Sequence, residues 1–543
     1  MATDILIGAS PEGAVTMALK RANRHGLVAG ATGTGKTVTL QVLAETFAKE
    51  GVAVFAADVK GDLSGIYAPG QPFPKWALDR AALCKLDDFA PAAPPVVFWD
   101  LYGEKGHPIR TTITEMGPVL LGRILEATDA QEGALTIAFK IADDWAQAGK
   151  PEGLLLNLQD MRALLTYVSE NADEIGKTYG LVSPTTVAAL QRKLLQLETD
   201  GADKFFGEPA LDLADMIRTT PEGRGVVNIL AADKLVQSPM LYSTFLLWLL
   251  SELWEELPEV GDLDKPKMVF FFDEAHLLFR DAEKALLARI EQVARLIRSK
   301  GVGIYFVTQS PTDVPDAVLA QLGNRFQHAL RAYTPADQKA VKAAAQSFRA
   351  KPGLDVYTTI QELGVGEALV STLDEKGAPT PVAKTAIRPP CSRVGPVTSL
   401  ERQTAISASG MSAKYDKAED QFSAYEVLSG RTAEAAALAA QQRAEKEAEE
   451  AAEKEAKAAS QAQAAQAKID AAAAKARAAE AAAEARAATA RAKAEAAEKA
   501  VSRRRGAAIE RTAERVGGRV LSNVGSSLTR ELMRGIFGNM RRR

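Results

Sequence analysis

Eight consecutive residues near the start of the chain have the types and spacing that bind the phosphates of a nucleotide. The run Gly30-Ala31-Thr32-Gly33-Thr34-Gly35-Lys36-Thr37 fits the pattern G-x-x-x-x-G-K-[ST]. Glycines are needed where several backbone N–H groups must point at one anion without an obstructing side chain. Lys36 can reach the β- and γ-phosphates, and the hydroxyl of Thr37 can ligate Mg²⁺. We therefore expect a nucleoside triphosphate to contact Gly30, Ala31, Thr32, Gly33, Thr34, Gly35, Lys36, Thr37 and Val38.

Two consecutive acids, Asp273 and Glu274, have the types that complete a hydrolytic site. They follow the apolar run 268–272, which reads as a buried strand. Asp273 would hold Mg²⁺ through its water shell, and Glu274 would polarise the attacking water as a general base. Without the phosphate-binding loop, the same residues would be read as a buried strand followed by an exposed turn.

Further polar residues follow two other predicted strands. Gln309 ends the run 302–309, where it could sense the γ-phosphate or orient water; the alternative is a hydrogen bond that closes the loop at 310–311. Asp58, Lys60 and Asp62 follow the apolar run 52–57. Ligands bind at the carboxyl ends of strands in open α/β sheets, so these three residues either face the nucleotide or form a charged turn. The sequence leaves both interpretations open.

The elements that must position these residues predict an α/β fold with a mostly parallel sheet. A helix is expected after the loop, over 38–49, because the pattern requires a strand–loop–helix setting. Helical periodicity fills 105–222, which we interpret as an α-helical insertion packed on the sheet. A terminal hairpin is expected from 366–371 and 381–384. The predicted strands are 25–29, 52–57, 96–100, 225–230, 268–272, 302–309 and 326–330.

Composition changes along the chain predict its division into parts. Residues 1–104 and 223–390 would form the two halves of the nucleotide-binding core, 105–222 the insertion and 391–430 a polar linker. Residues 431–500 are rich in alanine and contain no Pro or Gly, which predicts a long helix. Because large apolar residues do not repeat in heptads there, a solvated helix is favoured over a coiled coil.

The final segment, 501–543, contains eleven Arg and three Glu, a net charge of +8. Its apolar residues recur mostly every four positions, which predicts a basic amphipathic tail. Such a tail can bind an anionic membrane surface, nucleic acid or a partner protein. It can equally pack against the acidic remainder of its own chain or a sister subunit.

Overall composition narrows the class of protein. The chain has 543 residues, 47% of them hydrophobic and 25% charged, with a net charge of −3, which is typical of a soluble globular protein. The two cysteines argue for a reducing compartment and against a disulfide framework. The start of the chain has no secretory signal pattern, and the longest apolar stretch, 240–250, is too short to span a membrane. We expect a cytoplasmic protein.

Residues 1–390 resemble the HerA/FtsK superfamily of hexameric DNA-pumping ATPases, and among them the bacterial HerA-like helicases. The resemblance is carried by NRHGLVAGATGTGKTVTLQ, FFFDEAHLLF and VTQSPTDVPDAVLAQLGNRF. It implies a RecA-like P-loop core that binds ATP and Mg²⁺, with catalytic roles for Lys36, Glu274 and Gln309 and metal contacts from Thr37 and Asp273. It also implies an arginine finger from a neighbouring subunit, for which Arg298 is the match and Arg295 the fallback.

The function implied by this resemblance is Mg²⁺-dependent ATP hydrolysis by a homo-oligomer, with a hexamer favoured, acting on DNA as a translocase or helicase. The chain departs from the superfamily pattern. Only 29 residues precede the loop, so we do not expect the β-barrel that archaeal HerA-type proteins carry before the core. We also do not expect the winged-helix domain found at the end of FtsK-type translocases. The alternatives are a nucleotide-gated scaffold, or an ATPase directed at a membrane or protein and anchored by 501–543.

Overall fold

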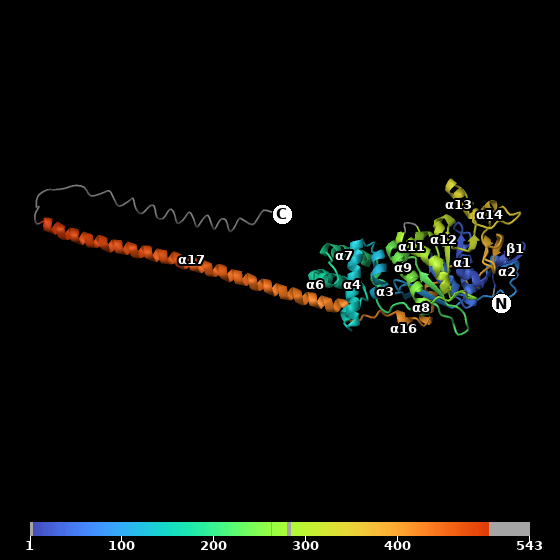
Figure 1. Ribbon diagram of the computed structural model, residues 1–543, viewed down its shortest axis with the longest axis horizontal. Helices are drawn as coiled ribbons and strands as arrows, with labels where there is room; N and C mark the ends of the chain where they lie inside the picture. Colours follow the sequence, from blue (N-terminus) through green and yellow to red (C-terminus); the bar gives the residue numbers. More distant parts are fainter. Residues whose placement is uncertain (1–3, 262, 280–283, 499–543) are drawn as a thin grey trace. The chain divides into compact units, whose positions relative to one another are not determined.

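The computed structural model describes residues 4–261, 263–279 and 284–498, and the chain divides into two units. The first unit, Met1–Ala437, holds every strand of the described chain. The second, Leu438–Arg543, holds most of the long helix α17 (Ala424–Glu498). Figure 1 shows both units coloured along the sequence.

One twelve-stranded sheet organises the first unit, in the order β2-β1-β12-β11-β10-β3-β9-β8-β4-β7-β5-β6. The pairings from β10 through β6 are all parallel. At the other edge, antiparallel pairs extend the sheet from β10 to β2. The strands are β1 (Asp4–Ser10), β2 (Gly13–Ala18), β3 (Gly26–Ala29), β4 (Ala53–Asp58), β5 (Val96–Asp100), β6 (His107–Pro108), β7 (Val227–Ala231), β8 (Met268–Phe272), β9 (Val302–Thr308), β10 (Asn324–Gln327), β11 (Glu367–Ser371) and β12 (Ala383–Ile387).

Helices cover the sheet and continue beyond it. They are α1 (Lys36–Lys49), α2 (Lys75–Leu83), α3 (Ile113–Ile124), α4 (Asp129–Gln147), α5 (Leu158–Glu170), α6 (Ala172–Thr178), α7 (Pro184–Thr199), α8 (Leu213–Met216), α9 (Pro239–Glu256), α10 (His276–Phe279), α11 (Lys284–Leu296), α12 (Asp316–Leu319), α13 (Pro335–Gln346), α14 (Val356–Glu362), α15 (Ser399–Ala408), α16 (Ser412–Tyr415) and α17.

The central strands are apolar on both faces because each face of the sheet packs against helices. Every residue of β3, β4, β7, β8 and β9 is buried. Two hydrophobic clusters pack on the central strands: one includes Phe47 of α1 and Phe271, and the other includes Phe270 and Trp248 of α9. This burial on both faces explains why the strands read as continuous apolar runs.

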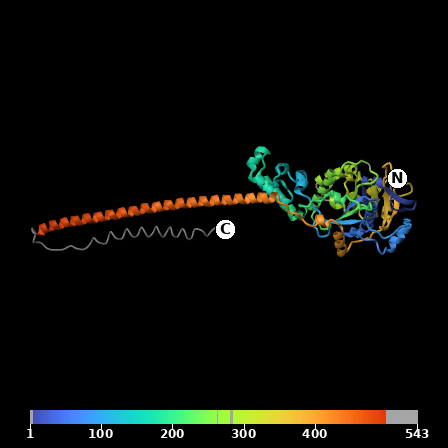
Figure 2. The same cartoon turned by 90° about the horizontal axis from the view of Figure 1, so that it is seen from below.

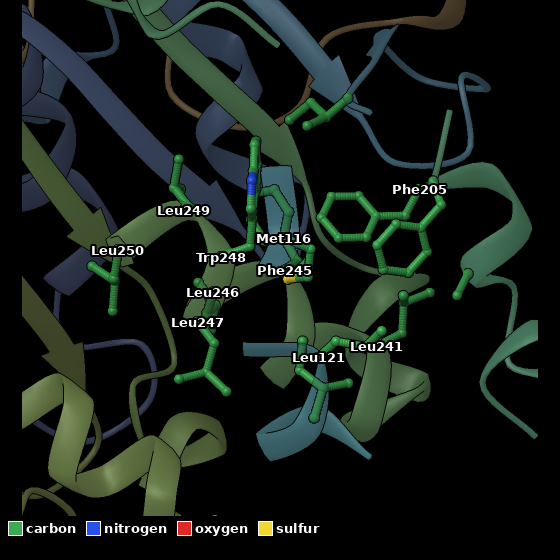
Figure 3. Close-up of a cluster of buried hydrophobic side chains, with 14 of the residues drawn as sticks. Met116, Leu121, Phe205, Leu241, Phe245, Leu246, Leu247, Trp248, Leu249 and Leu250 are labelled. Atoms are coloured by element: carbon green, nitrogen blue, oxygen red, sulfur yellow. The ribbon is translucent and has the colours of Figure 1, made fainter. Parts of the chain in front are cut away.

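The helical insertion forms its own layer and joins the sheet through α9. Its helices α4, α6 and α7 lie at one end of the first unit, whereas β1, α13 and α14 lie at the other, in both views (Figures 1 and 2). Met116 and Leu121 of α3 pack with Phe205 and the apolar face of α9, as Figure 3 shows. The insertion is thereby attached to the same core that supports the sheet.

Residues 388–426, here named the strap, run from the end of the sheet to the start of α17. The carboxylate of Glu45 in α1 accepts N–H bonds from Cys391 and Ser392 at 2.9–3.1 Å. Further along, Asp416 lies 2.6 Å from the buried ring of His107. Within 391–430, which the composition predicts to be a linker, the structure places α15, α16 and the first turns of α17, all within the first unit. A few residues of this polar stretch, Tyr415 among them, are deeply buried.

Most predicted elements agree with the structure to within a few residues, and the differences have identifiable causes. β2 is an edge strand with little burial, and α2 lies in the Pro- and Ala-rich stretch 68–95, so neither has a strong apolar pattern. Residues 431–498 of the predicted Ala-rich helix lie within α17, and 499–500 lie outside the described residues. The predicted tail 501–543 lies outside the described residues. Among the helices that the structure describes, none is long and apolar enough to cross a membrane.

Candidate active site

The phosphate-binding loop connects β3 to α1 and is fixed by bonds to three neighbouring strands or their ends. Gly30 N–H donates to Thr308 O at 3.2 Å, Ala31 N–H to Ala329 O at 2.8 Å, and Gly366 N–H to Thr34 O at 2.9 Å. The backbone also requires glycine. Gly30 has φ 156°, and a Cβ there would lie 2.5 Å from the Cβ of His328. These bonds and the glycine backbone together fix the conformation of the loop.

Lys36 lies folded over this loop. Its Nζ donates to Gly30 O at 2.7 Å and Ala31 O at 3.1 Å. Burial lowers the pKa of Lys36, while the negative charges of Glu274 and Asp273 oppose that shift. Both bonds are to neutral carbonyl oxygens, so an anionic phosphate is a stronger partner for this ammonium group.

His328 forms the floor of the loop, a role that the sequence analysis missed. Its Nε2 lies 2.9 Å from the hydroxyl of Thr39 in α1, and burial lowers its pKa to about 4. The ring is therefore neutral near pH 7. The only sequence signal was a histidine inside a predicted strand, 326–330, with no metal-ligand spacing to mark it.

Asp273 and Glu274 lie at the carboxyl end of β8, on the same edge of the sheet as the loop. Both are buried, with 6% and 4% of their surfaces exposed. Gln309, at the end of β9, donates from Nε2 to Glu274 Oε2 at 3.2 Å. The alternative for Gln309 was a hydrogen bond that closes the loop at 310–311. Asp313 closes that loop instead, because its carboxylate accepts from the hydroxyl of Thr308 and from the N–H of Ser310.

Lys60 pairs with Glu274 from the neighbouring strand. Its Nζ bonds Glu274 Oε1, and Nδ1 of His276 lies 3.1 Å from Oε2 without completing a hydrogen bond. Burial would raise the pKa of Glu274, but the hydrogen bonds from Lys60 and Gln309 outweigh it and lower that pKa. The sequence left open whether 58–62 faces the nucleotide or forms a charged turn, and each interpretation holds for a different residue. Lys60 faces the site, and Asp58 forms the turn by accepting the N–H of Gly61 at 2.8 Å.

The donor chemistry of this edge fits a magnesium ion bound together with a nucleotide. Burial and the charge of Glu274 raise the pKa of Asp273 to about 7, and Asp58 and Asp62 add to that effect. A divalent cation would relieve this accumulation of negative charge. Asp273 and the hydroxyl of Thr37 would hold it. In the described part of the chain, no group of three or more His, Cys, Asp or Glu could bind a metal alone, and Mg²⁺ commonly relies on one or two carboxylates plus phosphates and water.

The two arginine candidates do not lie with these residues. Arg298 is exposed in the short helix η6 (Ile297–Lys300), which precedes β9, and Arg295 is exposed at the end of α11. Because β9 has seven residues, the start and end of the strand are about 20 Å apart. Arg298 therefore lies near the amino end of β9, whereas the phosphate-binding loop of the same chain lies at the carboxyl ends of the strands.

Comparison with known proteins identifies the family. A family model described as Helicase HerA-like C-terminal matches residues 4–543. The chain belongs to this family. Its phosphate-binding loop and sheet form a P-loop nucleotide-binding core, and the predicted α/β fold with a mostly parallel sheet is confirmed.

Individual relatives of this HerA-like chain are more distant. The probable helicase MJECL08 of Methanocaldococcus jannaschii is 30% identical over 154 residues, which are 26% of this chain and 28% of that relative. The match thus spans less than a third of the relative's length.

Solved structures of two other proteins are similar to the fold. The plasmid coupling protein TrwB, in complex with the ATP analogue ADPNP, is 18% identical with a TM-score of 0.46, and the match covers 73% of this chain and 94% of TrwB. VirB4 of Thermoanaerobacter pseudethanolicus is 14% identical with a TM-score of 0.44, covering 74% and 98%. At these identities the likeness concerns the fold only.

Proposed function

We propose that this protein hydrolyses ATP with Mg²⁺ at the edge of the sheet that carries the loop, and that it uses the reaction to move along DNA as part of a ring. The observation that carries the proposal is the convergence of the loop, Asp273, Glu274 and Gln309 at the carboxyl ends of β3, β8 and β9. Lys36 would bind the β- and γ-phosphates, and Mg²⁺ held by Asp273 and Thr37 would offset their charge.

The hydrolytic step is supported by the position of Glu274. Its carboxylate is buried and kept ionised by its hydrogen-bond donors, so it can accept a proton from water. Gln309 bonds that same carboxylate and would orient the water or sense the γ-phosphate. The reaction needs no covalent intermediate on the protein, because positioning and charge stabilisation account for most of phosphoryl-transfer catalysis.

The proposal of a ring rests on Arg298, and six subunits are favoured because the chain resembles hexameric ATPases. A cation across the sheet from its own site can act only in the site of another copy. A head-to-tail contact that places Arg298 near the neighbour's loop would close into a ring if the rotation between subunits closes. Such a residue stabilises the charge of the transition state.

DNA is the proposed substrate polymer because the family is named for a helicase and the matched relative is a probable helicase. A cytoplasmic location is part of the proposal, since both cysteines, Cys84 and Cys391, are free thiols. A second candidate, an ATPase directed at a membrane or protein, is favoured by the eleven arginines within 501–543.

The experiment is the ATPase rate of the full chain with Mg²⁺, measured without DNA, with duplex DNA and with single-stranded DNA, alongside the mass of the assembly. We expect a severalfold increase with one form of DNA and a mass near six subunits in the presence of ATP. An ATPase rate that neither form of DNA changes would contradict the DNA proposal. Turnover stimulated instead by anionic vesicles, and lost on deletion of 501–543, would favour the second candidate.

A further inference from the structure

Glu274, the residue proposed to activate water, has both of its carboxylate oxygens engaged. Oε1 accepts from Lys60, and Oε2 accepts from Gln309 at 3.2 Å. A general base needs an oxygen within hydrogen-bond reach of the water it deprotonates. Each oxygen can accept a second hydrogen bond, but the ammonium group of Lys60 stabilises the carboxylate anion and so weakens Glu274 as a base while the pair lasts.

Lys60 is the partner with freedom to move. Its side chain is 47% exposed although the carboxylate it bonds is 4% exposed, so its stem can swing at little cost in packing. The turn that carries it is fixed: Gly61 has φ 79° and donates its N–H to the buried carboxylate of Asp58 at 2.8 Å. The base of the side chain is anchored while the ammonium group is mobile.

The site thus contains two ammonium groups that rest on protein oxygens. Lys36 bonds two carbonyl oxygens of the loop, and Lys60 bonds Glu274. The charge of Lys60 also acts on Lys36, lowering its pKa after the larger effects of burial and the two acids, which places both cations in one neighbourhood. A triphosphate in the loop would present charged oxygens to both.

The parallel register explains why Lys60 can reach this position. Ala57 of β4 is paired with Phe272 of β8. Lys60 comes three residues after Ala57, and Glu274 two residues after Phe272, so both follow the ends of adjacent strands at the edge where the loop also lies.

We propose that Lys60 contacts the γ-phosphate of bound ATP, and that its transfer from Glu274 to the phosphate frees Glu274 for the attacking water. Lys60 would then couple recognition of the third phosphate to release of the general base, so that the base is free only when hydrolysable nucleotide is present. This inference rests on the proposed function of the same site.

The test is equilibrium binding of AMP-PNP and of ADP, each with Mg²⁺, to the full chain and to Lys60→Met. We expect Lys60→Met to lose about tenfold in AMP-PNP affinity, the effect of one charge-assisted hydrogen bond to phosphate. Its ADP affinity should change less than about twofold, since ADP lacks the γ-phosphate that the lost bond would reach. Lys60→Arg, which keeps the charge, should retain most of the preference for AMP-PNP.

Lys105→Met is the matched control. Lys105 is 48% exposed and bonds one carboxylate, that of Asp233, at 2.6 Å, so it has the same exposure and the same type of partner as Lys60. It should bind both nucleotides as the wild type does. Equal AMP-PNP to ADP affinity ratios for wild type, Lys60→Met and Lys105→Met would overturn the inference.

A double-mutant cycle gives a readout that a structural role for Lys60 would not move. In Glu274→Gln the neutral amide competes less strongly for Lys60, so AMP-PNP should bind more tightly than to wild type, and adding Lys60→Met should cancel that gain. A gain that persists in the double variant would contradict the transfer of Lys60. Failure of the wild-type chain to bind either nucleotide would instead refute the proposed function, and the inference with it.

Discussion

At the scale of single residues, Glu274 has an unusual backbone conformation for a side chain of its type. Its φ is 49°, in the left-handed region that non-glycine residues rarely adopt. Strained backbone of this kind costs on the order of 1–3 kcal/mol and tends to occur at functional sites. Here the conformation turns the chain sharply after β8, and the Glu274 carboxylate meets Lys60 and Gln309.

Asp58 provides a prediction about pH at the same scale. Burial and the charge of nearby Asp62 raise its pKa to about 7, from 3.8 in the unfolded chain. The folded protein therefore holds this proton more tightly, and the stabilisation present below pH 3.8 is lost as pH rises through about 7. Asp58→Asn cannot ionise, and its side-chain oxygen can still accept the N–H of Gly61.

We expect Asp58→Asn to match the wild type in stability near pH 4 and to become more stable by about 2–4 kcal/mol near pH 8. Urea unfolding of both proteins across this range measures the difference. A stability difference that stays constant with pH would contradict a raised pKa for Asp58.

At the scale of elements, the sequence predicted the central strands well because apolar runs buried on both faces leave a strong signal. β5 is found at 96–100 as predicted. Pairing between strands leaves no such signal. The meeting of Lys60 with Glu274 depends on the register of β4 and β8, which are separated by more than two hundred residues. The sequence could therefore place Lys60 at a strand end but not identify its partner.

The strap escaped prediction for a related reason. Its attachment depends on single polar contacts to distant elements rather than on an apolar pattern of its own. Asp160 of α5 illustrates this: Oδ1 accepts from Ser423 Oγ at 2.6 Å and Tyr425 N–H at 2.8 Å, while Oδ2 accepts the N–H groups of Leu156 and Asn157. One buried carboxylate thus joins the insertion to the start of α17.

We expect Asp160→Ala to destabilise the first unit by about 2–4 kcal/mol, because four donors lose their acceptor and two of the lost bonds are buried. Asp355→Ala is the comparison, since Asp355 is exposed and caps α14 through the N–H groups of Tyr357 and Thr358; its loss should cost about 1 kcal/mol. Urea unfolding measures both. Equal losses in the two variants would contradict the anchoring role of Asp160.

At the scale of the whole molecule, Arg298 lies before the start of β9, whereas the phosphate-binding loop of its own chain lies at the carboxyl ends of the strands. This arrangement predicts complementation. Lys36→Ala would lack a working loop but keep its arginine, and Arg298→Ala would keep its loop but lack the arginine. Each variant alone should have little activity.

Mixed in equal amounts and allowed to exchange subunits, the two variants should recover roughly a quarter of wild-type turnover, since about one interface in four then combines an intact loop with an intact arginine. The ATPase rate of the mixture measures this, with the mass confirming that mixed assemblies form. Mixed assemblies that stay inactive would contradict a role for Arg298 in a neighbouring site.

The central claim is that ATP is hydrolysed at the loop with Glu274 as the base. Its most direct test is the rate of phosphate release from Mg²⁺-ATP by the wild type and by Glu274→Gln, with ATP binding measured on both. The account predicts that Glu274→Gln binds ATP at least as well as the wild type and releases phosphate about 10²–10⁴ times more slowly. Wild-type phosphate release by Glu274→Gln would contradict it.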